Sequence, residues 1–487
     1  MPDEHSAVPP ARFVHRIPTR LRQYWKLLAL IVVSMVAMAI LFGPNRMHPY
    51  ITGDASILSA EITDNIAGTV DLFDAEVPHS LTIDLTPAEY SDMITAYEKD
   101  GAKKWVTADI TIDDTPISDV AVRLKGNSTL MSLRPADARP GGAPTAAGGP
   151  AVDMPAMPAM AAMASADDPT TLPLLISFDR NADGRGYQGL TELSVRPGTP
   201  VLNEALALSL TAQTGQPTQR YAYATYTING ETTTRLLLEH PDDTYANTLF
   251  DSDGYLYKAD ANSRLEYRGT DQSEYADQFK AINSVDNGNL APIINFLRWL
   301  DQADDTEFDE HLADWVDVDS LARYLATQNL LANADDMGGP GQNYYLWYSL
   351  ETKKITVVSW DLNLAMQGDA GVGPTDEVQM GPPPAEMAAM FADMMPPGGG
   401  GGGPQFGNPL KTRFLESDAM AGTYLAAYWD LYHRMYGGGQ AQALLDDIAA
   451  SVPVTDGLSQ DELDTATASM RQWLDERTAA LQALREG

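Results

Sequence analysis

The stretch KKITVVSWDLNLAM, residues 353–366, decides the fold. Its β-branched run at 355–358 predicts a buried β-strand, and Trp360 and Asp361 follow that strand directly. A carboxylate at the end of a hydrophobic strand is desolvated unless a cation or hydrogen-bond donors compensate it. Asp361 is therefore the first candidate functional residue.

A second group of polar residues lies just upstream, in ANADDMGGPGQNYYLWY, residues 332–348. Asp335, Asp336 and Asn343 stand between a predicted helix and a strand that can pair with 355–360 as a hairpin. Protein kinases use a similar arrangement, in which a loop Asp accepts the substrate proton and a later Asp holds magnesium. The alternative is structural: the loop carboxylates cap turns and Asp361 forms a salt bridge.

A third candidate is VAVRLKGNSTL, residues 120–130. Arg123 and Lys125 alternate along a predicted strand that ends in a turn at 126–129, which includes Asn127. A basic side chain beside a Gly/Ser turn with backbone N–H donors suits an anion. The sequence contains neither GxxxxGK[ST] nor a G-x-G-x-x-G fingerprint after a strand.

The order of predicted elements indicates an α+β fold with two lobes, the N-terminal part rich in strands and the C-terminal part rich in helices. Hairpins are predicted with turns at 113–116 and at Asn229–Gly230. Thr86 is a plausible N-cap for the first globular helix, which Gly101 would end. Helices are predicted at 86–101, 201–215, 273–301, 307–334, 410–436 and 461–486.

The N-terminal region has the pattern of a membrane anchor. The apolar run 27–43 is roughly long enough to span a bilayer. The preceding segment, 1–26, is basic, which predicts a cytoplasmic N-terminus, a single span and a main domain outside the cytoplasm. A cleaved signal peptide is the alternative, although no small-x-small site follows the run. Residues 44–67 would form a stalk.

The remaining residues, 68–487, would form one kinase-like domain with two insertions of low complexity, at about 134–169 and 368–409. Both are rich in Pro, Gly and Met, and the density of Pro and Gly in the first sustains neither helices nor sheets. In the second, PAEMAAMFADMM, residues 384–395, is compatible with a short helix that has an apolar stripe.

The composition excludes several classes of function. The chain has no cysteine, so disulfides and thiolate chemistry are excluded. Its net charge is −35, which repels nucleic acid and favours cations or basic proteins as partners. DRNADG, residues 179–184, matches the first half of a calcium loop, but Leu190 occupies the position of the required acid, so a calcium-dependent surface protein has little support.

Taken in order, several motifs resemble the spore-coat CotH-type atypical protein kinase family over about 70–440, excluding the insertions. WDLNLAM is the most specific of them. The others are RLKGNSTL, YTINGE followed by LLLEH, GYLYKAD, and ADDMGGPGQNYYLWY.

The resemblance implies a kinase that uses ATP and Mg²⁺ to phosphorylate Ser or Thr of a protein. With the net charge, we expect that substrate to be basic or Ser-rich. It implies Asp335 as the catalytic carboxylate, with the adjacent Asp336 as the other possibility. It implies Asp361 and Asn343 as ligands of the metal. The residues implied to bind the nucleotide are Lys125, Asn127, Glu239 and Lys258.

The chain departs from the family pattern after GNS, where a basic Pro-Lys-Lys-Ser run is common and here a long insertion leads to TLPLLISFD. Fewer lysines weaken the positive field near the phosphates. The alternative function is therefore a catalytically degraded surface, assembly or binding module on the same fold.

Overall fold

The computed structural model describes residues 62–126, 129–134, 164–242, 244–283, 289–378 and 407–486, all within the unit Ile57–Gly487. The predicted anchor, 27–43, lies outside these residues. Within the described part of the chain, none of the helices combines the length and apolar character that crossing a bilayer requires.

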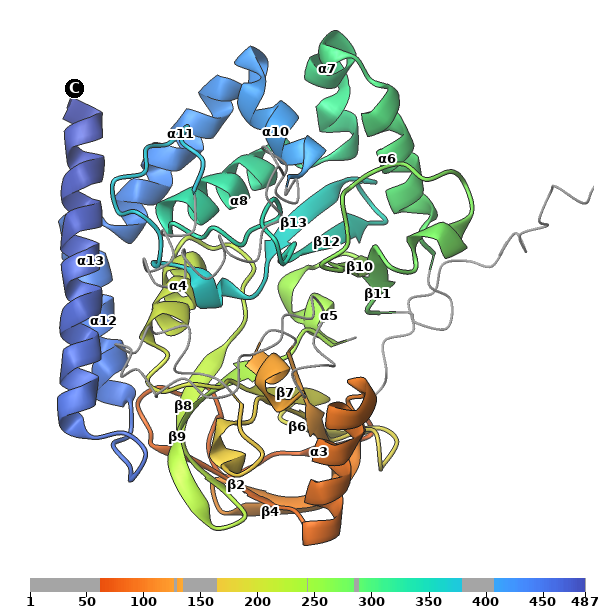
Figure 1. The fold of residues 1–487 in the computed structure, drawn as a ribbon. Coiled ribbons are helices and arrows are strands. Elements are labelled where there is room, and N and C mark those ends of the chain that lie inside the picture. Colours follow the sequence, from red (N-terminus) through yellow and green to blue (C-terminus); the bar gives the residue numbers. More distant parts are fainter. Residues whose placement is uncertain are drawn as a thin grey trace, which may run out of the picture. The chain divides into compact units, whose positions relative to one another are not determined.

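The N-terminal half is built around a closed barrel with strand order β2-β3-β4-β5-β7-β9-β8 (Figure 1). In β3, alternate side chains from Val106 to Ile112 point into the barrel core, as the period of a strand requires. The barrel strands are β2 (His79–Asp84), β3 (Val106–Ile112), β4 (Thr115–Leu124), β5 (Leu174–Ser177), β7 (Glu192–Val195), β8 (Tyr221–Ile228) and β9 (Glu231–Glu239).

The predicted turns and the first helix are confirmed. Asp113 and Asn229 both have positive φ in their hairpin turns. Helix α3 (Pro87–Asp100) begins at Thr86, whose side chain accepts a hydrogen bond from the N–H of Glu89, and ends at Gly101 in the left-handed conformation. A short parallel pair, β1 (Asp64–Ile66) with β6 (Arg185–Tyr187), lies outside the barrel.

The C-terminal half combines a sheet of order β11-β10-β12-β13 with helices. Strands β12 (Tyr344–Ser349) and β13 (Ile355–Ser359) pair antiparallel, as predicted. The other strands are β10 (Gly254–Ala259) and β11 (Phe279–Ala281), and the helices are α4 (Leu202–Gln213), α5 (Tyr245–Leu249), α6 (Ala291–Gln302), α7 (Asp305–Trp315), α8 (Val318–Leu330), α10 (Pro409–Glu416), α11 (Asp418–Met435), α12 (Gln440–Ser451) and α13 (Gln460–Glu486).

Three predicted helices were wrong in extent. The segment 410–436 is two helices, α10 and α11, divided at Ser417, which is extended and whose side chain caps α11. The segment 273–301 contains strand β11 at the edge of the sheet, and helix begins only at Ala291, where a proline occupies the first turn. The segment 307–334 is divided at Val316, which is extended, and Asp317, whose side chain caps α8. The caps override the continuous helical pattern.

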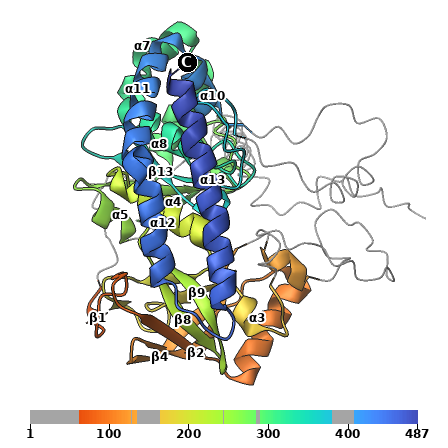
Figure 2. The same cartoon turned by 90° about the vertical axis from the view of Figure 1, so that its left-hand side faces the viewer.

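Helix α4 connects the two halves. It packs against α11, α12 and α13, and its apolar side chains share one core with the C-terminal helices. Helices α12 and α13 run side by side and reach from α11 toward the barrel (Figure 2). Residues 164–169 and 368–378, which the sequence assigned to the insertions, include the buried side chains of Ala164, Ala370 and Val372.

A buried histidine ties the start of the barrel together. His79 Nδ1 lies 2.7 Å from Asp113 Oδ2, and Nε2 lies 2.8 Å from the carbonyl oxygen of Asp74. Because both partners are acceptors, the ring is best satisfied with both nitrogens protonated. Burial lowers the pKa of His79, but the hydrogen bonds to Asp113 and Asp74 outweigh it and leave the pKa raised.

We expect His79→Gln to destabilise the protein more at acidic than at alkaline pH. Since the folded-state pKa is raised, this stabilisation is fully present below about pH 6.5, the unfolded value, and is lost as the pH rises through the folded value. Urea unfolding at pH 5.5 and pH 9 measures the difference. His433→Gln, at an exposed histidine on α11, is the control, and an equal loss at both pH values would contradict the expectation.

Candidate functional site

Asp361 is held rigidly at the end of β13. Its backbone is left-handed (φ 54°, ψ 61°), which turns the chain sharply out of the strand. Trp360 beside it is buried and packs edge-on against Tyr345 and His240. The carboxylate is therefore fixed by a strand on one side and a turn on the other.

Asp361 belongs to a buried ion cluster that sequence reasoning missed. Arg196, directly after β7, donates from Nε to Glu204 Oε2 at 2.7 Å, and its Nη2 contacts both Glu204 and Asp361. Glu204, on α4, is completely buried. Burial by itself would raise the pKa of Asp361, but the Arg196 guanidinium holds it below its usual range, so the carboxylate stays ionised.

A weak signal for this cluster does exist in the sequence. Glu204 is the lone charged residue in the apolar run LNEALALSL, 202–210, where a helical carboxylate is desolvated. Its neighbour Asn203 donates to the carbonyl oxygens of Asn363 (2.6 Å) and Ala365 (3.1 Å). Helix α4 is thus connected to Asp361 through the Glu204–Arg196 ion pair. It also contacts the loop after Asp361 directly, through Asn203.

Asp335 lies in the loop between α8 and β12, with both carboxylate oxygens bonded. Oδ1 accepts from the N–H of Gly341 at 2.5 Å, and Oδ2 accepts from Asn343 Nδ2 at 2.9 Å. A Cβ on Gly341 would lie 2.6 Å from Oδ2, so this position requires glycine. Burial, and more weakly the Asp361 charge, raise the pKa of Asp335.

Asp336 is committed elsewhere. Its Oδ2 lies 2.5 Å from Lys411 Nζ on α10, and its Oδ1 accepts from the N–H of Gly338. Asp336 therefore joins the loop to α10, whereas Asp335 lies with Asn343 and within electrostatic reach of Asp361. This geometry makes Asp335 the better candidate for a general base.

Lys125 and Lys258 meet at Trp360. Their ammonium groups lie 5.2 and 4.9 Å from the centre of its ring, which favours cation–π attraction. Lys125 also donates to Ser194 Oγ at 2.5 Å. Burial, then the nearby charges of Arg196 and Lys258, lower the pKa of Lys125 to about 7. An anion here would relieve this electrostatic cost.

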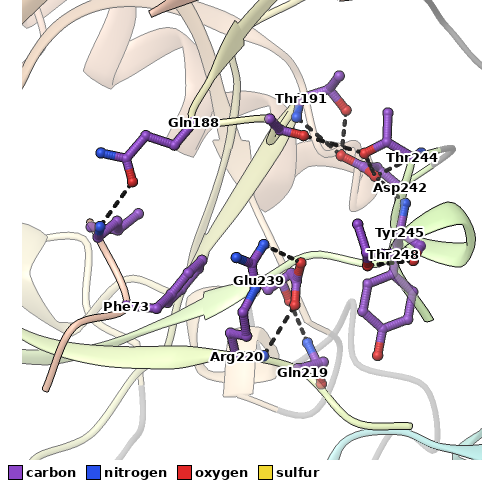
Figure 3. Close-up of polar contacts among 12 residues, drawn as sticks. Phe73, Gln188, Thr191, Gln219, Arg220, Glu239, Asp242, Thr244, Tyr245 and Thr248 are labelled. Atoms are coloured by element: carbon purple, nitrogen blue, oxygen red, sulfur yellow. Dashed lines mark hydrogen bonds and ion pairs between the residues drawn. The ribbon is translucent and has the colours of Figure 1, made fainter. Parts of the chain in front are cut away.

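The structure places Glu239 apart from this group. Its carboxylate accepts from the backbone N–H and the side chain of Arg220, at 3.1 and 2.7 Å, and Gln219 donates to its carbonyl oxygen (Figure 3). Arg220 in turn stacks on Phe73 and lines a surface pocket of about 400 Å³. Asn127 lies outside the described residues.

The donor set fits a kinase-type magnesium ion. Mg²⁺ takes one or two protein carboxylates and completes its shell with phosphate oxygens and water. Asp361 supplies a carboxylate, and Asn343, whose amide nitrogen is bound to Asp335, has its carbonyl oxygen to offer. In the described ranges no three or more His, Asp or Glu side chains gather as a metal site by themselves.

Comparison with known proteins identifies a family and similar solved structures. The model of the CotH kinase protein family matches residues 199–480, which include Glu204, Lys258, Asp335 and Asp361. No curated protein matches the chain. Among solved structures, the crystal structure of a Helicobacter pylori proinflammatory kinase, CtkA, is similar with 13% identity and a TM-score of 0.30, over 63% of this chain and 90% of that one.

We expect Glu204→Gln to lower the free energy of unfolding by about 1–3 kcal/mol, because it removes one of two carboxylates from a buried guanidinium. Urea unfolding of the purified protein measures the change. Glu307→Gln, at an exposed residue on α7, is the control. Equal stability of Glu204→Gln and wild type would show that Asp361 alone compensates Arg196.

Proposed function

We propose that this chain, which belongs to the CotH kinase protein family, transfers the γ-phosphate of ATP to a Ser or Thr hydroxyl of a protein substrate with Mg²⁺. The observation that carries the proposal is the ion cluster of Arg196, Glu204 and Asp361. Protein kinases position the phosphates through a basic residue on a strand paired with a helix glutamate, next to a magnesium-binding Asp. Arg196, directly after β7, and Glu204 on α4 supply that pair here.

The residues around Asp361 divide the work of binding. Asp361 and Asn343 would hold the metal, which when bound neutralises charge on the phosphates. Lys125 and Lys258 would contact phosphate oxygens, since both are half-buried cations beside Trp360 with lowered pKa values. Arg196, which contacts both Glu204 and Asp361, would hold the Asp361 carboxylate in position near Lys125 and Lys258.

Asp335 would act as the general base. It would accept the proton of the substrate hydroxyl as the oxygen attacks the γ-phosphorus and the bond to the ADP leaving group breaks. Its raised pKa suits proton transfer near neutrality better than an ordinary carboxyl group does. Gly341 and Asn343 fix its orientation.

The second candidate is a surface or assembly module without catalysis. One observation favours it: Asp361 already has a partner in Arg196, as a purely structural carboxylate would. In either case we propose that the domain lies outside the cytoplasm, attached to the membrane by the segment 27–43.

We expect Asp361→Asn to abolish a Mg²⁺-dependent, ATP-induced rise in melting temperature that the wild-type full chain shows. The amide keeps the shape of the side chain but removes the charge that holds the metal. Differential scanning fluorimetry with ATP, with and without Mg²⁺, measures the rise. Asp447→Asn, at an exposed carboxylate on α12, should behave like wild type.

Phosphoryl transfer separates the two candidate functions. Asp335→Asn should keep the ATP-induced rise but lose transfer to a protein acceptor by about 10²-fold or more, the usual contribution of a general base. If the folded wild type shows neither an ATP-induced rise nor transfer, the kinase proposal fails and the module remains.

A further inference from the structure

A cationic strip runs along the barrel face outside the core. Arg123 and Lys125 are two positions apart on β4 and its end, so they point to the same side at a spacing of about 7 Å. Electrostatic coupling extends the strip through Lys103 and Arg180 at one end and through Lys258 and Lys280 at the other. We call these six residues the cationic strip.

Four of the six cations stack on two tryptophans, one at each end of the strip. The inner end is Lys125 and Lys258 on Trp360, next to Asp361. The outer end is Arg123 and Arg180, whose guanidinium groups lie 4.8 and 4.9 Å from the centre of the Trp105 ring. Stacking on an aromatic face holds an arginine in place and leaves its N–H edge available.

The outer end lacks an anion of its own. Over the ranges that the structure describes, neither Arg123 nor Arg180 forms an ion pair, and the buried Nε of Arg123 has no hydrogen-bond partner. Glu192 lies close enough to influence Arg123, but burial raises the pKa of Glu192 to about 7, which weakens it as a permanent counter-ion. In a chain of net charge −35, unpaired arginines point to a ligand.

We propose that the outer end, Arg123 and Arg180 on Trp105, binds an acidic group of the acceptor protein, near the hydroxyl that receives the phosphate. The proposal rests on the proposed function for the identity of the inner end, where the nucleotide phosphates lie. The guanidinium edges suit a planar carboxylate or a phosphate in bidentate contact. The preferred acceptor sequence then has Asp, Glu or a phosphorylated residue beside the acceptor Ser or Thr.

An acidic acceptor segment runs against the expectation of a basic partner, which came from net charge alone. Net charge describes the average surface, whereas an acceptor sequence meets the local field of the strip. A globally acidic protein can still select an acidic segment where its cations are concentrated.

Peptide binding tests the outer end without requiring catalysis. Fluorescent peptides with one Ser would be matched except for flanking residues, which are Ala, Glu, phosphoserine or Lys. Anisotropy titrations with the full chain should give the Glu and phosphoserine peptides about tenfold tighter binding than the Ala peptide, a difference of about 1.4 kcal/mol. The ratio between these two peptides distinguishes carboxylate from phosphate recognition.

The decisive variant is Arg180→Gln, because Arg180 is exposed and its replacement should leave folding intact. It should reduce binding of the acidic peptides to the level of the Ala peptide, while Arg180→Lys keeps part of the preference. Arg434→Gln, at an exposed arginine on α11, should bind like wild type.

The result also separates this inference from the kinase proposal. If the wild type prefers acidic peptides and Arg180→Gln loses this preference, the inference about the outer end is supported. This holds even if phosphoryl transfer is absent, in which case only the kinase proposal fails. Equal binding of Ala and Glu peptides overturns the inference. The ATP-induced rise in melting temperature gives a second check. If Arg180→Gln loses as much of this rise as Lys258→Gln does, the outer end binds the nucleotide, and the inference is overturned.

Discussion

The Arg196 guanidinium, placed between Glu204 and Asp361, is the interaction on which the rest of the site depends. Removing a charge from water costs several kcal/mol unless a partner compensates it, so a fully buried Glu204 can be accommodated only when Arg196 reaches it. That requirement fixes the register of α4 against the end of β7. The same guanidinium also contacts Asp361. One set of charges therefore holds together the barrel, helix α4 and the end of strand β13.

A second buried arginine secures the loop on the other side of Asp361. Arg477 on α13 is fully buried and donates to backbone carbonyl oxygens, among them those of Leu330, Ala370 and Val372. Leu330 ends α8, just before the Asp335 loop, and the other two follow the turn after Asp361. The C-terminal helix therefore ties the end of α8, which precedes the Asp335 loop, to the segment that follows Asp361.

Local patterns predicted the strands, turns and first helix, and they placed Asp361 at a strand end, because these features depend on neighbours in sequence. The ion cluster could not be found this way, since Arg196 and Asp361 are 165 residues apart and nothing local pairs them. The choice between Asp335 and Asp336 was open for the same reason: the observation that favours Asp335 is the contact of Asp336 with Lys411, 75 residues away in the sequence. Helices α6 to α8 were misjudged because capping and sheet pairing outweigh hydrophobic periodicity.

The electrostatics of the cationic strip support the proposed binding of phosphate beside Asp361. Lys125 has its pKa lowered to about 7 because it is buried among other cations, and keeping such a group near its neighbours opposes folding. A chain with 67 acidic residues has abundant carboxylates with which to neutralise it. A module that had lost its ligand would be free to acquire those ion pairs or to replace the lysine. Lys125 instead stacks on Trp360, beside Asp361. This arrangement is expected where a polyanion that binds and is released supplies the missing negative charge.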